Sequence, residues 1–189
     1  STSATVPGRR AGWRDEGRIQ DDTSGNRSGG WINVNLPPAS SIVAWNRNFA
    51  YTSDATPQFL EYRLNVPAAA YYEVYVHQVG GLLNLTSQAP FEVFESGGSS
   101  RTVLVDQTNF TTPGWYRLGD ALLAMGNQLV VRLTNTNIGA GKFVAADAIM
   151  LVLNRRLSPN VIISGVEESN DEAVPDRARE GGRIGIGQS

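Results

Sequence analysis

Between residues 31 and 153 the sequence consists of short runs of β-branched and aromatic residues, each ended by Gly, Pro or Asn. Residues 60–66 are typical, because every second residue is apolar and the run stops at Pro67. A period of two places those side chains on one face of a half-buried strand. The other predicted strands are residues 31–36, 72–76, 91–94, 102–105, 115–118, 129–133 and 143–153. This pattern predicts an all-β, jelly-roll-like antiparallel β-sandwich.

The 189 residues divide into three parts by composition. We expect an N-terminal extended arm over residues 1–30, the β-sandwich domain over residues 31–153, and a C-terminal extended arm over residues 154–189. The arms are rich in Gly, Ser, Arg and Asp and contain few apolar residues. Segments of that composition cannot bury enough surface to fold alone.

The two arms share a short pattern, Arg-Asp-Glu-Gly-Arg-Ile at residues 14–19 and Arg-Glu-Gly-Gly-Arg-Ile at residues 179–184. The charged side chains of the arms need partners of opposite charge, and neighbouring copies of the protein are the simplest source of such partners. An extended arm can add a strand to the edge of a neighbour's sheet through main-chain hydrogen bonds. The residues expected to make these assembly contacts are Trp13, Arg14, Arg18, Ile19, Arg179, Arg183, Ile184 and Ile186.

These arms suggest a non-enzymatic extracellular structural protein, whose subunits self-assemble into a filament, sheath or surface array. Head-to-tail contacts generate open polymers unless their rotation closes. The expected partner is therefore other copies of the chain, as a homopolymer, at an extracellular or cell-surface location.

Charge and composition argue against several other partners. The formal net charge is −2, and the Arg residues of the arms are interleaved with Asp and Glu, so we expect no nucleic-acid binding. No apolar run is long enough to cross a bilayer, and we expect no membrane insertion. The chain has no Cys, which removes disulfides and thiolate ligands. We expect no cofactor and no metal.

The titratable residues do not form a recognisable catalytic set. His77 is the only His, and no Gly-x-Ser-x-Gly turn accompanies it. Glu61, Glu73 and Glu92 each alternate with apolar residues, so we expect them to face solvent instead of forming a glycosidase pair. We expect no catalytic residue and no enzymatic activity.

Asp147 is the most specific carboxylate, because it lies among small residues inside an apolar run. One interpretation is a calcium or sugar ligand, but calcium needs several convergent oxygens and no dense Asp/Asn loop lies nearby in the sequence. The interpretation we favour is a carboxylate that accepts backbone N–H bonds and fixes a strand crossing.

Several motifs in the central region resemble the golvesin C-terminal-like domain, which also ends xanthan lyases. They are the proline turn at residues 64–67 with the strand at 72–76, residues 89–93 and 103–107, the segment Gly114-Trp115-Tyr116-Arg117-Leu118-Gly119, and Phe143-Val144-Ala145-Ala146-Asp147-Ala148-Ile149. The resemblance covers about residues 31–153 and neither arm. It implies a jelly-roll-like, carbohydrate-binding-module-like sandwich on secreted proteins, and it carries over no binding residues.

The resemblance supplies an alternative function, a secreted carbohydrate-binding module whose partner is a polysaccharide. Aromatic rings bind the apolar faces of sugar rings, but they also fill sandwich cores. Trp45 and Tyr51 flank the polar stretch of residues 46–50 and are the candidates for glycan contact.

Overall fold

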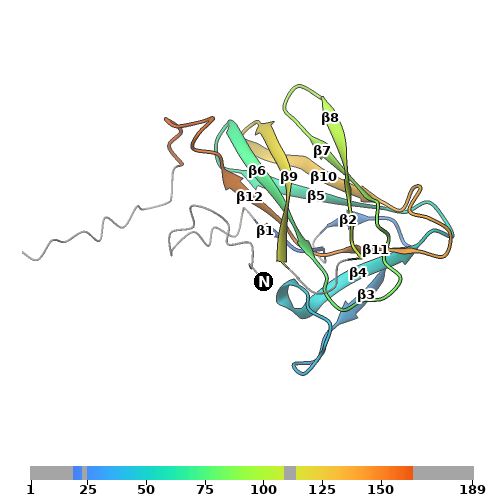
Figure 1. Cartoon of the computed structure of the whole chain (residues 1–189). Helices are drawn as coiled ribbons and strands as arrows, with labels where there is room; N and C mark the ends of the chain where they lie inside the picture. Colours follow the sequence, from blue (N-terminus) through green and yellow to red (C-terminus); the bar gives the residue numbers. More distant parts are fainter. Residues whose placement is uncertain (1–18, 23–24, 109–113, 164–189) are drawn as a thin grey trace, which may run out of the picture.

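The computed structural model describes residues 19–22, 25–108 and 114–163 (Figure 1). These ranges form an antiparallel all-β sandwich, which confirms the predicted fold class. The strands are β1 (Ile19–Gln20), β2 (Asn26–Arg27), β3 (Ile32–Asn35), β4 (Asn48–Ser53), β5 (Phe59–Val66), β6 (Ala70–Gln78), β7 (Ala89–Phe94), β8 (Ser100–Val105), β9 (Gly114–Leu123), β10 (Gly126–Thr134), β11 (Phe143–Ala146) and β12 (Ile149–Leu153).

Three sheets build the sandwich. Sheet A has the order β1-β12-β6-β9, and sheet B has the order β2-β5-β10-β7-β8. Sheet C has the order β11-β4-β3, and the chain passes from it into sheet A between β11 and β12. Figure 1 shows β3 and β4 on the side of the molecule opposite to the β7–β8 hairpin.

The main core lies between sheets A and B and follows the period of two in each strand. In β5 the apolar residues Leu60, Tyr62, Leu64 and Val66 are all buried, and they pack against alternate residues of β6 and β12. Burial of apolar surface at about 25 cal/mol per Å² is the main force that holds the two sheets together.

The outer face of sheet B corrects one expectation. Glu61 does not face solvent: its residue is only 7% exposed, and its carboxylate accepts hydrogen bonds from Arg132 at 2.6 and 3.1 Å. Arg132 lies directly opposite Glu61 in the β5–β10 register and also reaches Glu92 at 3.6 Å. Asn26 donates to Glu61 from β2. A carboxylate can be buried here because neighbouring strands bring it partners.

Two short strands come from the part of the chain assigned above to the N-terminal arm. β1 pairs with β12, with Ile19 opposite Met150, and β2 pairs with β5. Residues 19–22 and 25–30 therefore contribute to the two main sheets of their own chain. Among the described residues, no helix is long and apolar enough to span a membrane.

Candidate functional site

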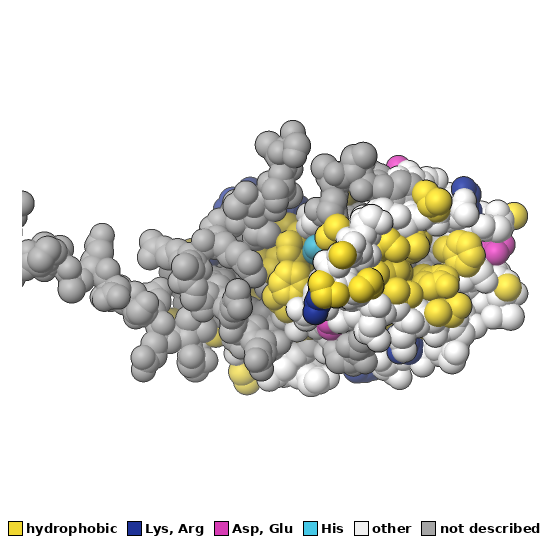
Figure 2. Space-filling model, turned by 90° about the horizontal axis from the view of Figure 1, so that it is seen from below, with side chains coloured by type: hydrophobic (Ala, Val, Ile, Leu, Met, Phe, Trp, Pro, Cys, Tyr) yellow, Lys and Arg dark blue, Asp and Glu magenta, His cyan; other side chains and the backbone are white. Residues whose placement is uncertain are grey.

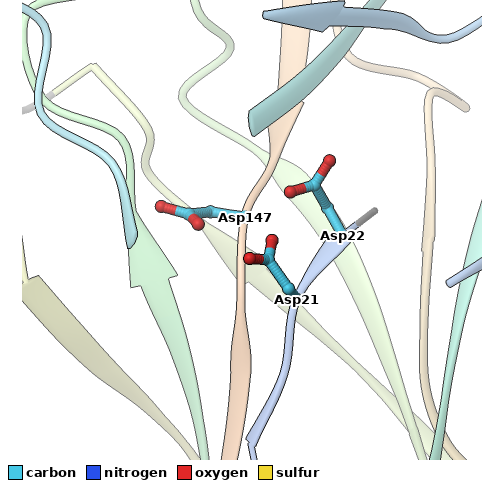
Figure 3. A group of neighbouring side chains, drawn as sticks. All are labelled: Asp21, Asp22 and Asp147. Carbon is cyan, nitrogen blue, oxygen red and sulfur yellow. The ribbon is translucent and has the colours of Figure 1, made fainter. Parts of the chain in front are cut away.

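Three carboxylates that are distant in the sequence meet beside sheet A; we call Asp21, Asp22 and Asp147 the aspartate cluster (Figure 3). Asp147 occupies the break between β11 and β12, and Asp21 and Asp22 directly follow β1. The pairing of β1 with β12 brings the two segments together. One carboxylate oxygen from each residue lies within 4.8 Å of the other two.

Asp147 connects several parts of the sandwich. Its Oδ2 accepts the backbone N–H of Trp45 at 2.9 Å and lies 2.7 Å from His77 Nδ1. Its backbone carbonyl accepts the Tyr62 hydroxyl at 2.6 Å. These contacts join β5, β6 and the 3-10 turn η3 (Trp45–Arg47) to the β11–β12 break. They fit the structural role expected from the sequence, and the side-chain contacts use only one of the two carboxylate oxygens.

Two of the three aspartates are deeply buried, and Asp21 is half-buried. Asp22 and Asp147 are 0% and 1% exposed. Among the residues that the structure describes, Asp22 Oδ2 and Asp147 Oδ1 have no hydrogen-bond partner. The Arg27 guanidinium comes within 3.9 Å of Asp22, which makes an ion pair but not a hydrogen bond.

Burial shifts the protonation of these groups. Burial, followed by the hydrogen bond and charge of Asp21, raises the pKa of Asp22 to about 8. The charge of Asp147 adds to this increase, and Arg27 opposes it. Burial also raises the pKa of Asp147, although the bonds from His77 and Trp45 act in the opposite direction. Both shifts arise because a charged carboxylate loses its hydration when buried.

Three aromatic rings pack beside the aspartate cluster, and we call Trp45, His77 and Trp115 the aromatic triad. The Trp115 ring centroid lies 5.1 Å from those of both Trp45 and His77, with tilted and edge-on geometry. Trp45 and His77 are 6.0 Å apart. Such tilted contacts are favourable between rings and fix their positions. Trp45 therefore belongs to a packed cluster.

A second aromatic group lies on the outer face of sheet C, and we call Ile32, Tyr51 and Phe143 the sheet C face. Tyr51 lies opposite Ile32 in β3, and its ring meets the Phe143 ring edge-on at 5.6 Å. Tyr51 and Phe143 are half-buried, and Ile32 is 53% exposed. Figure 2, which views the side where β3 and β4 lie, shows hydrophobic side chains gathered in a band across this face.

Two loops cover the rest of this face, one containing residues 41–43 and the other residues 79–85. Phe49 in β4 is buried against Val79 and Leu85. The loops meet at a bridge between Val43 and Gly80, next to the left-handed backbone of Gly81, where a Cβ would lie 2.9 Å from the Ser41 carbonyl. Residues 79–85 can therefore lie this close to the other loop because position 81 lacks a side chain. The loops leave the sheet C face accessible.

A pocket of about 420 Å³ opens at the end of β4 and β11. The β4–β5 and β10–β11 loops line it with Asp54, Pro57 and residues 135–140. Asp54 accepts the Gly141 N–H at 3.2 Å, which joins the two loops. Asn135 ties them further, because its amide donates to the carbonyls of Ser53 and Thr56 at 2.6 Å each. Phe143 pairs with Ser53, and Asp54 of the pocket directly follows Ser53 in the chain.

The predicted glycan contacts fall in different clusters. Trp45 belongs to the aromatic triad and Tyr51 to the sheet C face. Of the predicted assembly residues, only Ile19 is described, and it pairs with Met150 of its own chain. The remaining assembly residues, Trp13, Arg14, Arg18, Arg179, Arg183, Ile184 and Ile186, lie outside the described residues.

Sequence reasoning missed Asp21, Asp22, Asp54 and Phe143 as site residues. Asp21 and Asp22 lie in a polar stretch that looked like part of the arm, and no local signal joins them to Asp147. The strand alternation could have placed Phe143 on the same face as Ala145, but not beside Tyr51, because register between strands is a tertiary property.

Comparison with known proteins confirms the family resemblance. The profile of the golvesin C-terminal domain matches residues 19–153. Golvesin from Dictyostelium discoideum is 30% identical over 114 residues, which are 59% of this chain and 19% of that protein. A xanthan lyase from Paenibacillus superimposes with a TM-score of 0.60 at 22% identity, over 72% of this chain and 13% of that one. This chain thus corresponds to a small part of these relatives.

A family 35 carbohydrate binding module from Clostridium thermocellum superimposes with a TM-score of 0.47 at 17% identity. The match covers 72% of this chain and 97% of that module.

Proposed function

This chain belongs to the golvesin C-terminal domain family, and we propose that it is a non-catalytic carbohydrate-binding module of a secreted protein. The proposed site is the sheet C face together with the pocket. The observation that carries the proposal is that Phe143, whose ring meets that of Tyr51, pairs with Ser53, the residue directly before Asp54 of the pocket.

The rings of Tyr51 and Phe143 suit the apolar face of a sugar. A pyranose presents axial C–H groups on one side, and these pack on aromatic rings as other apolar surfaces do. Both rings are half-buried, so their positions are fixed before a ligand binds. A preordered site loses less conformational entropy on binding.

The pocket supplies the hydrogen-bonding groups that sugar hydroxyls need. Asp54 uses one carboxylate oxygen for the Gly141 N–H, and a carboxylate has further acceptor capacity. Thr136 and Asn137 add a hydroxyl and an amide to the lining. A few polar groups at the edge of an apolar surface fix the orientation of a ligand.

The contacts of the glutamates support a binding role more than a catalytic one. Glu61 and Glu92 both pair with Arg132, and Glu73 lies 3.6 Å from Arg117. A general acid needs a raised pKa, whereas the pKa of Glu61 is lowered: burial acts to raise it, but the bonds from Arg132 and Asn26 outweigh that effect.

Self-assembly through the arms stays a prediction. The one assembly residue that is described, Ile19, extends a sheet of its own chain, which favours docking within the subunit at that position. Together with the family membership, this contact supports carbohydrate binding as the better proposal.

Affinity electrophoresis against soluble polysaccharides, with neutral and acidic examples, tests the proposal. We expect retardation of the wild-type domain by at least one polysaccharide. Tyr51→Ala or Phe143→Ala should weaken the affinity at least tenfold, as measured by titration calorimetry, because a stacking surface is lost. Asp54→Asn should also weaken binding while keeping the side-chain volume.

The matched control is Tyr116→Ala, which removes an aromatic ring that is 43% exposed on β9. This variant should bind like the wild type. Circular dichroism and thermal melts establish that each variant is folded. Retardation by none of the polysaccharides, or equal binding by the Tyr51→Ala and wild-type domains, would contradict the proposal.

A further inference from the structure

The aspartate cluster has ligand oxygens that the described hydrogen bonds do not use. Asp22 Oδ2 and Asp147 Oδ1 are buried without a hydrogen-bond partner among the described residues. Figure 3 shows the three side chains close together on two backbone segments. We propose that Asp21, Asp22 and Asp147 bind a hard divalent cation of the Ca²⁺ class. This site is separate from the proposed glycan site.

The spacing fits one ion. The three ligand oxygens lie within 4.8 Å of one another. Ca²⁺ binds oxygens at about 2.3–2.6 Å, so ligands on opposite sides of the ion lie up to roughly 5 Å apart. A calcium site needs further carboxylates that the sequence around Asp147 does not contain. Asp21 and Asp22, which follow β1, supply them.

Asn48 borders the aspartate cluster, and only with its amide oxygen turned toward Asp21 and Asp22 would it add a fourth ligand. One terminal atom of its amide lies 3.0 Å from Asp22 Oδ1 and 2.8 Å from Asp21 Oδ1. If that atom is nitrogen, it donates to both carboxylates. If it is oxygen, the amide nitrogen donates to Asp21 Oδ2 at 3.3 Å, and three oxygens face one another. An ion between them makes the second orientation favourable, since it replaces repulsion with coordination.

The partners of Asp147 leave one oxygen for an ion. His77 Nδ1 and the Trp45 N–H both contact Oδ2, so Oδ1 is the oxygen that can bind it. Bonds of this kind orient the carboxylates of metal sites. His77 itself is engaged with Asp147, which leaves an oxygen-only donor set. That set favours Ca²⁺ over ions such as Zn²⁺ that prefer nitrogen and sulfur.

The charges at the site also favour a cation. Three carboxylates lie together, two of them fully buried, and the Arg27 guanidinium stays 3.9 Å from Asp22. Buried charges need to be paired or to coordinate a metal. A single divalent ion would neutralise more of this charge than Arg27 does alone.

Terbium luminescence tests the site, because Tb³⁺ occupies calcium sites and emits when a nearby Trp is excited. The backbone of Trp45 contacts Asp147, and the Trp115 ring packs on Trp45. We expect sensitised Tb³⁺ emission from the full chain, displaced by added Ca²⁺. At a Ca²⁺ concentration about 100-fold above its Kd, the Tm should rise by roughly 5–10 °C relative to EDTA.

Asp21→Asn and Asp22→Asn keep the side-chain volume and should each lower Tb³⁺ and Ca²⁺ affinity at least tenfold. Asp106→Asn, at an exposed loop carboxylate, is the matched control and should leave both unchanged. Absence of sensitised emission, a Tm that is the same in Ca²⁺ and EDTA, or equal affinities in Asp22→Asn and the wild type would each overturn the proposal. Glycan binding in EDTA by a folded domain would leave the proposed function standing.

Discussion

The aspartate cluster and the sheet C face belong to one sandwich but are built in opposite ways. The cluster consists of three carboxyl groups from distant parts of the sequence, two of them buried, and Trp45 and His77 hold Asp147. The sheet C face consists of apolar side chains that neighbouring strands present partly to solvent. A buried polar group cannot lose its partners without destabilising the fold, whereas an exposed apolar group is free to bind something else.

The largest expected effect is at Asp147. Replacing it by Ala removes the bonds to Trp45 and His77 and leaves both donors without that acceptor. We expect the free energy of unfolding to fall by about 3 kcal/mol in EDTA, measured by urea denaturation. Asp106→Ala, at an exposed position, should change it by less than about 0.5 kcal/mol. Equal losses of unfolding free energy in Asp147→Ala and Asp106→Ala would contradict the expectation that the buried carboxylate stabilises the fold more than the exposed one.

Glu61 should give an intermediate and pH-dependent effect. Burial acts to raise its pKa, but hydrogen bonds from Arg132 and Asn26 lower it below the usual 4.5. The ionised form is therefore favoured in the folded state, and its stabilisation is present above about pH 4.5 and lost as pH falls through the folded pKa.

Urea denaturation of Glu61→Gln measures this contribution. We expect a loss of about 1–2 kcal/mol at pH 7, shrinking as pH falls toward 3. Glu95→Gln should lose less than about 0.5 kcal/mol, because the Glu95 side chain is 30% exposed and that of Glu61 only 10%. A difference for Glu61→Gln that stays constant between pH 7 and pH 3 would argue against the ion pair as its cause.

The smallest effect on stability is expected at Ile32. Ile32→Thr keeps a β-branched residue in β3 at a position that is 53% exposed, so the free energy of unfolding should change by less than about 0.5 kcal/mol. Glycan affinity should fall about two- to fivefold, because apolar surface beside Tyr51 is lost. A large loss of stability with unchanged glycan affinity would assign this face to the core instead.

The alternating pattern was sufficient for most strands, as Leu60 to Val66 illustrates, because side-chain period depends only on local backbone geometry. It failed at residues 143–153, predicted as one strand. The structure divides them into β11 and β12, which lie in different sheets. At the break, the carbonyl of Ala148 accepts the backbone N–H of His77. No local property of this apolar run indicates that the chain passes from one sheet to another within it.

Glu61 and the aspartate cluster show the same limit for polar residues. Alternation placed Glu61 on the outer face of its strand, but its burial depends on Arg132 and Asn26 from two other strands. Asp147 was singled out because a carboxylate inside an apolar run requires partners. Asp21 and Asp22 were not, since their neighbours along the chain are polar.

The sequence by itself determined the all-β class, the family and the residues that form the core, because period and turn chemistry are local. Only the tertiary structure decided which carboxylates meet and which aromatic rings contact each other on sheet C. Strand pairing brings Asp21 and Asp22 to Asp147, and strand register places Phe143 beside Tyr51. Those contacts depend on order and register within the sheets, which arise when the whole hydrophobic core is buried at once.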